Sequence, residues 1–340
     1  MGCCANCFGD SGLAAKIRND HVDHGTCEYC GSEDVDLVKP QQLRDLFELV
    51  VGIYTDQDGG QPLVSLLKSD WAMFGHERMD TAHAKELLAE ILDDGEIVRR
   101  CFVLSPAYRS DSVREWKEFR DELMRCNRFF PRRTPDTDSL RSWLPHLRAN
   151  PDDLARTFYR ARLQDGPTPF PPEHMGAPPL GRSSHGRANP AGIPYLYLAS
   201  DQNTAVAEVR PHTGEVASVA TFAIDDNLQV VDLRNPRGTV SPFLLEDEQQ
   251  VGHLRRSMDF LALLGEELTR PVLPSAAHID YLPSQYLCEF VKHCKFDGVL
   301  YRSSVGAGFN LALFDPSRAR VGIVVQYKVD RVTVSVQRQP

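Results

Sequence analysis

The chain has 340 residues, of which 42% are hydrophobic and 25% are charged, a composition typical of soluble globular proteins. This length favours two or three domains, and no apolar run reaches the roughly 20 residues that a membrane-spanning helix needs. The 38 Lys and Arg residues against 47 Asp and Glu residues leave a formal charge of -9, which argues against direct nucleic-acid binding.

The N-terminus carries no secretory signal, because no basic stretch is followed by an apolar core, so we expect a cytoplasmic protein without a membrane partner. Gly2 with Cys3 and Cys4 suggests acylation, but Asn6 stands where that motif needs Ser or Thr. The nine cysteines are an odd number, and those after residue 100 lie in apolar or helical patterns, as reduced buried thiols do. The pattern does not fit a disulfide framework.

Two C-x2-C pairs, separated by nineteen residues, have the spacing of a four-thiolate zinc site. Each pair points two thiolates at one ion, and a closed tetrahedral site favours one structural zinc over a catalytic one. Unmetallated thiols are the alternative. Cys3 is a possible substitute ligand, and His21 and His24 are interpreted as solvated loop residues. The predicted ligands are Cys4, Cys7, Cys27 and Cys30.

We assign residues 1–36 to a zinc-ribbon-like module. This segment holds seven acidic and two basic residues, so it lacks the charge of a nucleic-acid finger. A structural clip or a protein-docking module is the better interpretation.

Residues 37–150 are predicted to form a helical domain, because apolar residues between positions 43 and 123 recur at helical spacing. Helices are expected to start at Thr81 and at Ser112, the latter with capping-box spacing. Arg141 and His146 match the loose signature of HEPN-type ribonucleases. Pro145 interrupts the helix that this signature needs, so we interpret the pair as structural.

Residues 151–340 are predicted to form an α+β domain, with a proline-rich loop at 167–179. Strands and helices do not alternate regularly, and no glycine loop has the spacing of a Walker or dinucleotide motif. The expected strands are residues 195–199, 216–224, 228–233, 310–314, 322–329 and 332–336. The expected helices are residues 204–210, 247–268 and 285–294, the first capped by Ser200 or Asp201.

Three polar residues gather at the start of this domain. Arg187 lies in a loop, Tyr197 follows ten residues later on a strand, and Glu208 follows after eleven more residues on a helix of small residues. Taken singly, each has an ordinary explanation on the surface or in a strand. Together they indicate a site.

These residues lie in segments that resemble the RES-domain toxins of bacterial toxin–antitoxin systems. The resemblance covers about residues 152–328, and the cysteine-containing helical region before it resembles a sub-type with a HEPN-like N-terminal region. The matching segments are FYRAR at 158–162, GRANPAGIPYLYLA at 186–199, TAVAEVRPH at 204–212, FDGVLYRSS at 296–304 and NLALF at 310–314.

The resemblance implies a fold similar to ADP-ribosyltransferase toxins, with NAD as the substrate and cleavage of its nicotinamide–ribose bond by hydrolysis or phosphorolysis. A growth-arresting toxin of this kind is held in check by an Xre-type antitoxin, and inhibition by the chain's own N-terminal region is an alternative. Two other functions stay open: an ADP-ribosyltransferase that modifies a macromolecule, and a non-catalytic zinc-containing scaffold.

The residue types suit this chemistry. Breaking an N-glycosidic bond builds positive charge on the ribose, which the carboxylate of Glu208 would stabilise. Arg160 and Arg187 are the expected diphosphate ligands, because a guanidinium group binds phosphate oxygens in pairs. Tyr197 is expected to enclose the nicotinamide ring, with Tyr195 as the second choice.

Ser303 occupies the position of the family's serine and would hold a ribose or phosphate oxygen; Ser304 is the second choice. The chain departs from the family at Ala188, where an aromatic residue is usual, so we expect a different pocket wall beside Arg187.

Overall fold

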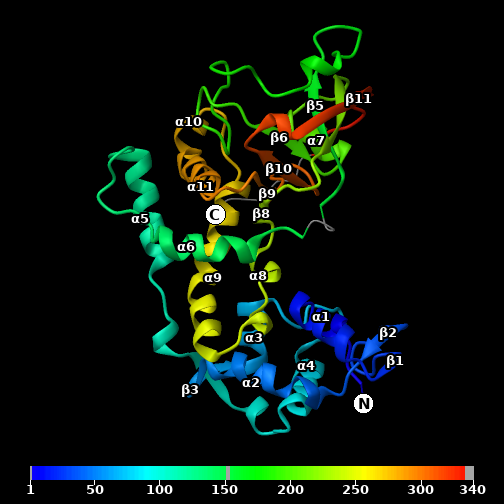
Figure 1. The fold of residues 1–340 in the computed structure, drawn as a ribbon, viewed down its shortest axis with the longest axis vertical. Coiled ribbons are helices and arrows are strands. Elements are labelled where there is room, and N and C mark those ends of the chain that lie inside the picture. The colour runs from blue at the N-terminus through cyan, green and yellow to red at the C-terminus, as the bar shows by residue number, and fades with distance from the viewer. Residues whose placement is uncertain (1, 151–153, 334–340) are drawn as a thin grey trace. The chain divides into compact units, whose positions relative to one another are not determined.

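A computed structural model describes residues 2–150 and 154–333. The chain splits into two compact units, each built from two stretches of sequence. Unit 1 comprises Met1–Glu115 and Asn235–Ala262, and unit 2 comprises Trp116–Arg234 and Leu263–Pro340. The predicted α+β class is confirmed (Figure 1). The division into domains 1–36, 37–150 and 151–340 stays a prediction. No helix in the described ranges is long and apolar enough to cross a membrane.

Unit 1 is built from helices and two small antiparallel sheets, β1–β2 and β3–β4. Its elements are α1 (Ser11–Asp20), β1 (Asp23–Gly25), β2 (Val35–Leu37), α2 (Arg44–Gly52), β3 (Tyr54–Pro62), α3 (Leu63–Trp71), α4 (Thr81–Leu92), β4 (Cys101–Leu104) and α8 (Pro236–Thr239). Two helices have residues in both units: α5 (Ser112–Arg125) and α9 (Glu248–Thr269).

The sheet β3–β4 departs from the all-helical prediction for residues 37–150. The polar run in β3 contains an Asp-Gly pair, a turn signal that the helical periodicity on either side concealed. Gly59 has a φ of +80°, and a Cβ at Gly60 would lie 2.4 Å from the carbonyl oxygen of Phe102, so both positions require glycine.

The predicted helix starts are close to the observed ones. Asp80, one residue before Thr81, caps α4 by accepting hydrogen bonds from the backbone amides of Ala82 and His83. Helix α5 begins at Ser112, as predicted.

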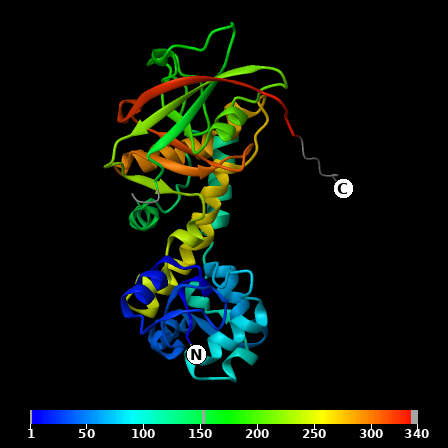
Figure 2. The same ribbon diagram turned by 90° about the vertical axis from the view of Figure 1, so that its right-hand side faces the viewer.

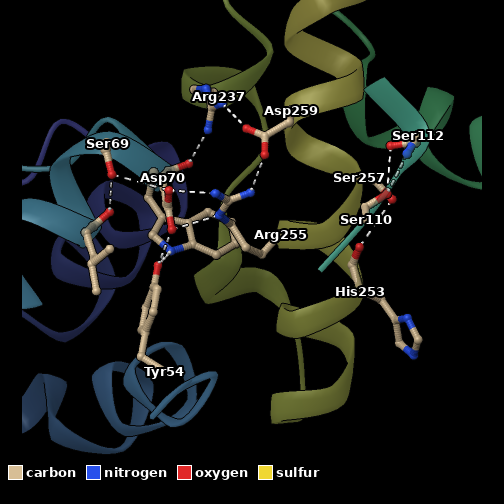
Figure 3. Close-up of polar contacts among 12 residues, drawn as sticks. Tyr54, Ser69, Asp70, Ser110, Ser112, Arg237, His253, Arg255, Ser257 and Asp259 are labelled. Atoms are coloured by element: carbon tan, nitrogen blue, oxygen red, sulfur yellow. Dashed lines mark hydrogen bonds and ion pairs between the residues drawn. The ribbon is translucent and has the colours of Figure 1, made fainter. Parts of the chain in front are cut away.

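A buried ion pair joins α3 to α9 within unit 1 (Figure 3). The carboxylate of Asp70 lies 2.7 Å from Nε and 2.8 Å from Nη2 of Arg255. It also accepts a hydrogen bond from the hydroxyl of Tyr54 at 2.9 Å. Arg255 pairs with Asp259 at 3.1 Å as well. Because Asp70 is only 6% exposed, removing its charge leaves the guanidinium of Arg255 without its closest partner.

We therefore expect Asp70→Ala to lower the free energy of unfolding of unit 1 by about 3 to 5 kcal/mol. Urea denaturation of the full chain measures the change. The matched control is Asp56→Ala, which removes an exposed ion pair with Arg100 and is expected to cost under about 1 kcal/mol. Equal effects of the two substitutions would contradict the structural role of the buried pair.

Unit 2 is built on a seven-stranded sheet in the order β11-β7-β5-β6-β10-β9-β8. The pairs are antiparallel except β8 with β9. Figure 2 shows β11, in red, along one edge of this sheet. The strands are β5 (Thr157–Leu163), β6 (Leu196–Ala199), β7 (Val216–Ile224), β8 (Val230–Asp232), β9 (Gly298–Arg302), β10 (Phe309–Leu313) and β11 (Ala319–Lys328). The helices are α6 (Thr137–Trp143), α7 (Gln202–Glu208), α10 (Ala277–Asp280) and α11 (Leu282–His293).

The two faces of the sheet bury different sets of side chains. One face packs a core of leucine, phenylalanine and valine, including Phe158, Leu198 and Leu311. The opposite face packs small residues, including Ala161 and Ala199, against Ala205 of α7. The small residues let α7 lie close to the sheet, which brings the end of this helix to the strands β6 and β10.

Most of the elements predicted for the C-terminal half are confirmed. Strand β7 has the predicted bounds, and α7, α9 and α11 lie within two or three residues of theirs. The proline-rich stretch holds only a short 3-10 turn, Pro172–His174. Strands β5 and β9 were not predicted, and the strand expected at 332–336 lies partly outside the described residues.

The structural interpretation of Arg141 and His146 agrees with the fold. Helix α6, which carries Arg141, ends at Trp143, and His146 lies in the 3-10 turn Leu144–Leu147. The two side chains therefore do not share one helix, as the HEPN-type signature would need.

Candidate active site

A cavity of about 530 Å³ in unit 2 is lined by residues from β5, β6, α7, β9, β10 and the loops that flank them. Among the residues predicted from sequence, Arg160, Arg187, Tyr197, Glu208 and Ser304 line it. Ser303 is not among the lining residues, but its hydroxyl donates a hydrogen bond to Glu208.

Tyr195 does not line this cavity. It is 1% exposed, and its ring packs against Phe314 with 4.9 Å between ring centroids, while Nζ of Lys292 lies 5.0 Å from its centroid. Of the two tyrosines considered, only Tyr197 is placed to contact a ligand in the cavity.

The register of four neighbouring strands brings the floor of the cavity together. Tyr159 pairs with Ala199, Ala199 with Asn310, and Asn310 with Tyr301. Directly paired residues point to the same face of a sheet, so these side chains form one row across it. Residues that are up to about 150 positions apart in the sequence thus become neighbours.

Glu208 is the last residue of α7, a helix that Asp201 caps by accepting from the amide of Thr204. Its Oε1 accepts a hydrogen bond from Nδ2 of Asn310 at 2.6 Å and from Oγ of Ser303 at 2.7 Å. Its Oε2 has no hydrogen-bond partner in the described part of the chain. The carboxylate is thus fixed through one oxygen, and the other is free to meet a ligand.

Ser303 is itself held in place. Its Oγ accepts hydrogen bonds from the backbone amides of Val305 at 3.2 Å and Gly306 at 3.0 Å. These amides fix the hydroxyl so that its hydrogen points to Glu208. Ser303 therefore acts on the carboxylate, and of these two neighbouring serines Ser304 lines the cavity.

The guanidinium group of Arg187 contacts a carbonyl oxygen, a hydroxyl group and an aromatic ring, but no carboxylate. Its Nη1 donates to the carbonyl oxygen of Arg270 at 2.7 Å, and its Nη2 lies 3.5 Å from Oγ of Ser304. The guanidinium carbon lies 5.1 Å from the ring centroid of Tyr281. No ion pair joins Arg187 to any residue between 2 and 150 or between 154 and 333. Its charge is thus available for an anion.

Arg160 lies where β5 and β6 diverge, since these strands share only the pair Tyr159 and Ala199. Its Nη1 donates to the carbonyl oxygen of Tyr197 at 3.0 Å, and its buried Nε has no hydrogen-bond partner. Burial, with a smaller contribution from Arg162, lowers the pKa of Arg160 to about 10, so the side chain is still charged at neutral pH. A buried cation without a carboxylate partner is a strong anion-binding group.

Tyr197 holds the loop that carries Arg187. Its hydroxyl donates to Oδ1 of Asn189 at 2.7 Å and accepts from the amides of Ala188 and Asn189. Burial raises the pKa of this hydroxyl. A Cβ at Gly186 would lie 2.6 Å from the same hydroxyl, so the loop requires glycine there. Tyr197 can therefore offer a ligand only its ring, because its hydroxyl is used.

Ala188 is fully buried and is not part of the cavity lining. The expectation of a different pocket wall beside Arg187 therefore stays a prediction. The backbone amide of Ala188 donates a hydrogen bond to the hydroxyl of Tyr197.

Sequence reasoning missed Asn310, Tyr301, Arg270 and Tyr281. Asn310 had a signal, since it is the one amide in an otherwise apolar strand, and such a buried residue needs a partner. Arg270 had no such signal in the sequence, because it contributes only a backbone carbonyl to the site. Its side chain pairs with the buried carboxylate of Glu267, which lies 3.6 Å from its Nη2.

The four predicted zinc ligands form a second cluster, in unit 1. The sulfur atoms lie within 4.8 Å of one another, and all four residues are buried thiols without a disulfide. Sγ of Cys4 lies 3.5 Å from that of Cys30, and Sγ of Cys7 lies 3.4 Å from that of Cys27. A tetrahedron with zinc–sulfur bonds of about 2.3 Å has sulfur–sulfur distances of about 3.8 Å, so the cluster fits such an ion.

The other candidate ligands lie apart from this cluster. Cys3 is buried but is not among the four clustered sulfur atoms. The exposed His21 bonds to the carbonyl oxygen of Arg18, and the exposed His24 lies between Asp34 and Asp36. Its two carboxylate partners raise the pKa of His24.

The family model of the RES domain matches residues 157–334, and the chain belongs to this family. A chain in the crystal structure of the M. tuberculosis MbcT–MbcA toxin–antitoxin complex is similar, with 16% identity over 56% of this chain and 93% of that one and a TM-score of 0.32. No curated protein matched the chain. The family assignment rests on the first of these comparisons.

Proposed function

We propose that the chain is an NAD-consuming enzyme that cleaves the nicotinamide–ribose bond. The observation that supports this best is the fixed carboxylate of Glu208 in the same cavity as two guanidinium groups, those of Arg160 and Arg187, that lack carboxylate partners. NAD carries a diphosphate for the cations and a ribose whose transition state is positively charged.

In the proposed reaction, the bond between the nicotinamide nitrogen and C1′ of the ribose breaks, and the bonding electron pair leaves with nicotinamide. The ribose becomes oxocarbenium-like, and the free Oε2 of Glu208 stabilises the developing charge more than it stabilises the ground state. Asn310 and Ser303 hold Oε1, so this oxygen needs no reorganisation during the reaction. An acceptor then adds to C1′ and loses a proton.

Arg160 and Arg187 would bind the diphosphate, and the ring of Tyr197 would enclose the nicotinamide. Water, inorganic phosphate and a macromolecule are the three possible acceptors. Incubation with NAD labelled in its adenylate half distinguishes the acceptors. The label appears in ADP-ribose if the acceptor is water, in ADP-ribose 1-phosphate if it is phosphate, and on protein or nucleic acid if it is a macromolecule. Nicotinamide release is common to all three. Its absence from folded, full-length protein would reject the proposal.

The proposal makes Asn310 a positioning residue for Glu208. We expect Asn310→Ala to lower kcat for nicotinamide release by roughly ten- to a hundredfold, the usual cost of losing the partner that orients a functional ligand. KM should change little, since Asn310 contacts the carboxylate rather than the diphosphate ligands. The matched control is Asn227→Ala, because Asn227 does not line the cavity. An effect on KM alone would contradict this role.

We also propose that Cys4, Cys7, Cys27 and Cys30 hold one structural zinc ion. The clustering of the four buried sulfur atoms supports this. When bound, zinc would link the two C-x2-C pairs across α1 and supply no chemistry to the cavity in unit 2.

We further propose that the enzyme acts as a growth-arresting toxin and that an Xre-type antitoxin or the N-terminal region holds it in check. Membership in the RES family supports this. Induced expression of the wild type and of Glu208→Gln tests it, since only the former should arrest growth. Unit 2 includes residues 116–150, so a fragment beginning at residue 152 would lack all of α5 and α6 and would be a poor test of inhibition.

A further inference from the structure

The segment that follows α5 has a composition unlike the rest of the surface. Residues 125–133 read RCNRFFPRR, here called the arginine–phenylalanine loop. Phe129 is 83% exposed and Phe130 is 82% exposed. Two consecutive phenylalanines with this exposure keep a large apolar area in water, which is unfavourable unless something else covers it.

Hydrogen bonds from two backbone amides fix the conformation of the loop that carries the two exposed phenylalanines. The amide of Phe130 donates to Oδ1 of Asn127 at 3.2 Å, and the amide of Arg132 donates to Oε1 of Glu122 at 2.8 Å. Pro131 fixes its own φ between these two bonds. The loop is therefore an ordered turn that presents its phenylalanines, rather than a tail that has failed to pack.

The charge of the loop is opposite to that of the whole chain. No Asp or Glu lies between residues 123 and 135, whereas the full chain carries a net charge of -9. None of the four guanidinium groups forms an ion pair or hydrogen bond with a residue that the structure describes. The four cations are Arg125, Arg128, Arg132 and Arg133.

We propose that the arginine–phenylalanine loop docks on an anionic lipid surface, with its two rings in the interface and its arginines on the headgroups. This proposal is independent of the proposed function. Phenylalanine beside arginine is the composition of segments that lie in a bilayer interface. Each cation near an anionic surface contributes separately, so four cations within nine residues give a large combined attraction.

A lipid surface fits the loop better than a protein or a nucleic acid does. A stable protein interface buries at least about 1,000 Å² in total, and nine residues on one turn supply too little area for that alone. Single-stranded nucleic acid binds in grooves that track its backbone, and the loop lines neither the cavity beside Glu208 nor three other pockets of the described residues. A bilayer needs neither a groove nor a matching surface.

This proposal departs from the sequence-based expectation of no membrane partner. That expectation followed from the missing secretory signal and the absence of an apolar run long enough to span a membrane. A peripheral loop needs no such segment, and charge is screened beyond about 8 Å, so the negative charge elsewhere on the chain has little influence where the loop touches the bilayer.

Co-sedimentation of the full chain with phosphatidylcholine vesicles, with and without phosphatidylserine, tests the proposal. We expect binding only when phosphatidylserine is present, and loss of binding at high salt. Arg132→Gln with Arg133→Gln should weaken it roughly thirtyfold, from about 1 kcal/mol per arginine. Phe129→Ser with Phe130→Ser should weaken it by about tenfold or more.

Two control variants change the same residue types elsewhere. Leu180→Ser removes another exposed apolar side chain, 83% exposed, and Arg109→Gln with Arg256→Gln removes two exposed cations. Both should bind as the wild type does. All the substituted side chains are exposed, and circular dichroism verifies that each variant is folded.

Three results would overturn the proposal. The first is equal binding of the wild type to both kinds of vesicle, and the second is equal vesicle binding by the loop variants and the wild type. The third is that the wild type binds no vesicles but binds a labelled single-stranded oligonucleotide, and that the loop variants lose this binding. The last result would assign the loop to nucleic acid instead.

Discussion

Glu208→Gln is expected to lower the rate of nicotinamide release from NAD by at least about a hundredfold, the usual loss when an electrostatic stabiliser of a transition state is removed. Glutamine keeps the size of the side chain and its acceptor oxygen, so the bonds from Asn310 and Ser303 can persist. What disappears is the negative charge beside the ribose. The loss should therefore appear in kcat, with KM for NAD changed far less.

The matched control is Glu173→Gln, an exposed glutamate in the 3-10 turn Pro172–His174, which should release nicotinamide as the wild type does. Urea denaturation of both variants excludes unfolding as the cause. If Glu208→Gln kept more than about a tenth of the wild-type kcat, the carboxylate would not be the stabiliser that the account requires.

The second large effect is expected at the cysteine cluster. Cys27→Ser with Cys30→Ser removes two of four thiolates, so the protein should lose its zinc. Structural zinc supplies about 10 to 16 kcal/mol in small zinc-finger peptides, more than a short segment gains from its own core. Residues 2–38, which hold one helix of ten residues and two strands of three, should therefore unfold.

Elemental analysis of the purified protein measures the metal, and hydrogen exchange measures the order of the N-terminal segment. The wild type should hold one zinc per chain, and a strong chelator should reproduce the effect of the double substitution. Cys126→Ser, which changes an exposed cysteine outside the cluster, should alter neither readout. Metal-free wild-type protein with a protected N-terminal segment would contradict the zinc proposal.

Local signals explain what could be predicted from the sequence. Strand β7 is rich in β-branched and small residues between turn signals, and Asp201 precedes a helical run, so both elements follow from neighbouring residues. The cysteine spacing encodes the cluster in the same way. Glu208, Arg187 and Tyr197 were grouped because polar residues gather in one stretch of sequence, and the family resemblance then supplied their expected roles; the structure places all three around one cavity.

Features that depend on register or on distant packing were missed. Asn310 meets Glu208 only because β10 pairs with β6, while Ser303 reaches it from the turn between β9 and β10. The carbonyl of Arg270 binds Arg187 across more than eighty positions of sequence. Residues 235–262 return to unit 1 although they lie within the segment predicted as one domain, and there Arg255 pairs with Asp70 and Phe243 packs against Phe47. No short window of sequence contains these pairings.

The most direct test of the central claim is a proton NMR time course of NAD incubated with the purified, full-length protein. The account predicts that free nicotinamide appears as NAD disappears, in equal amounts, and that the adenosine and diphosphate parts stay joined. Intact NAD, or cleavage at the diphosphate to give AMP and nicotinamide mononucleotide, would contradict the assignment of Glu208, Arg160 and Arg187 to nicotinamide–ribose cleavage.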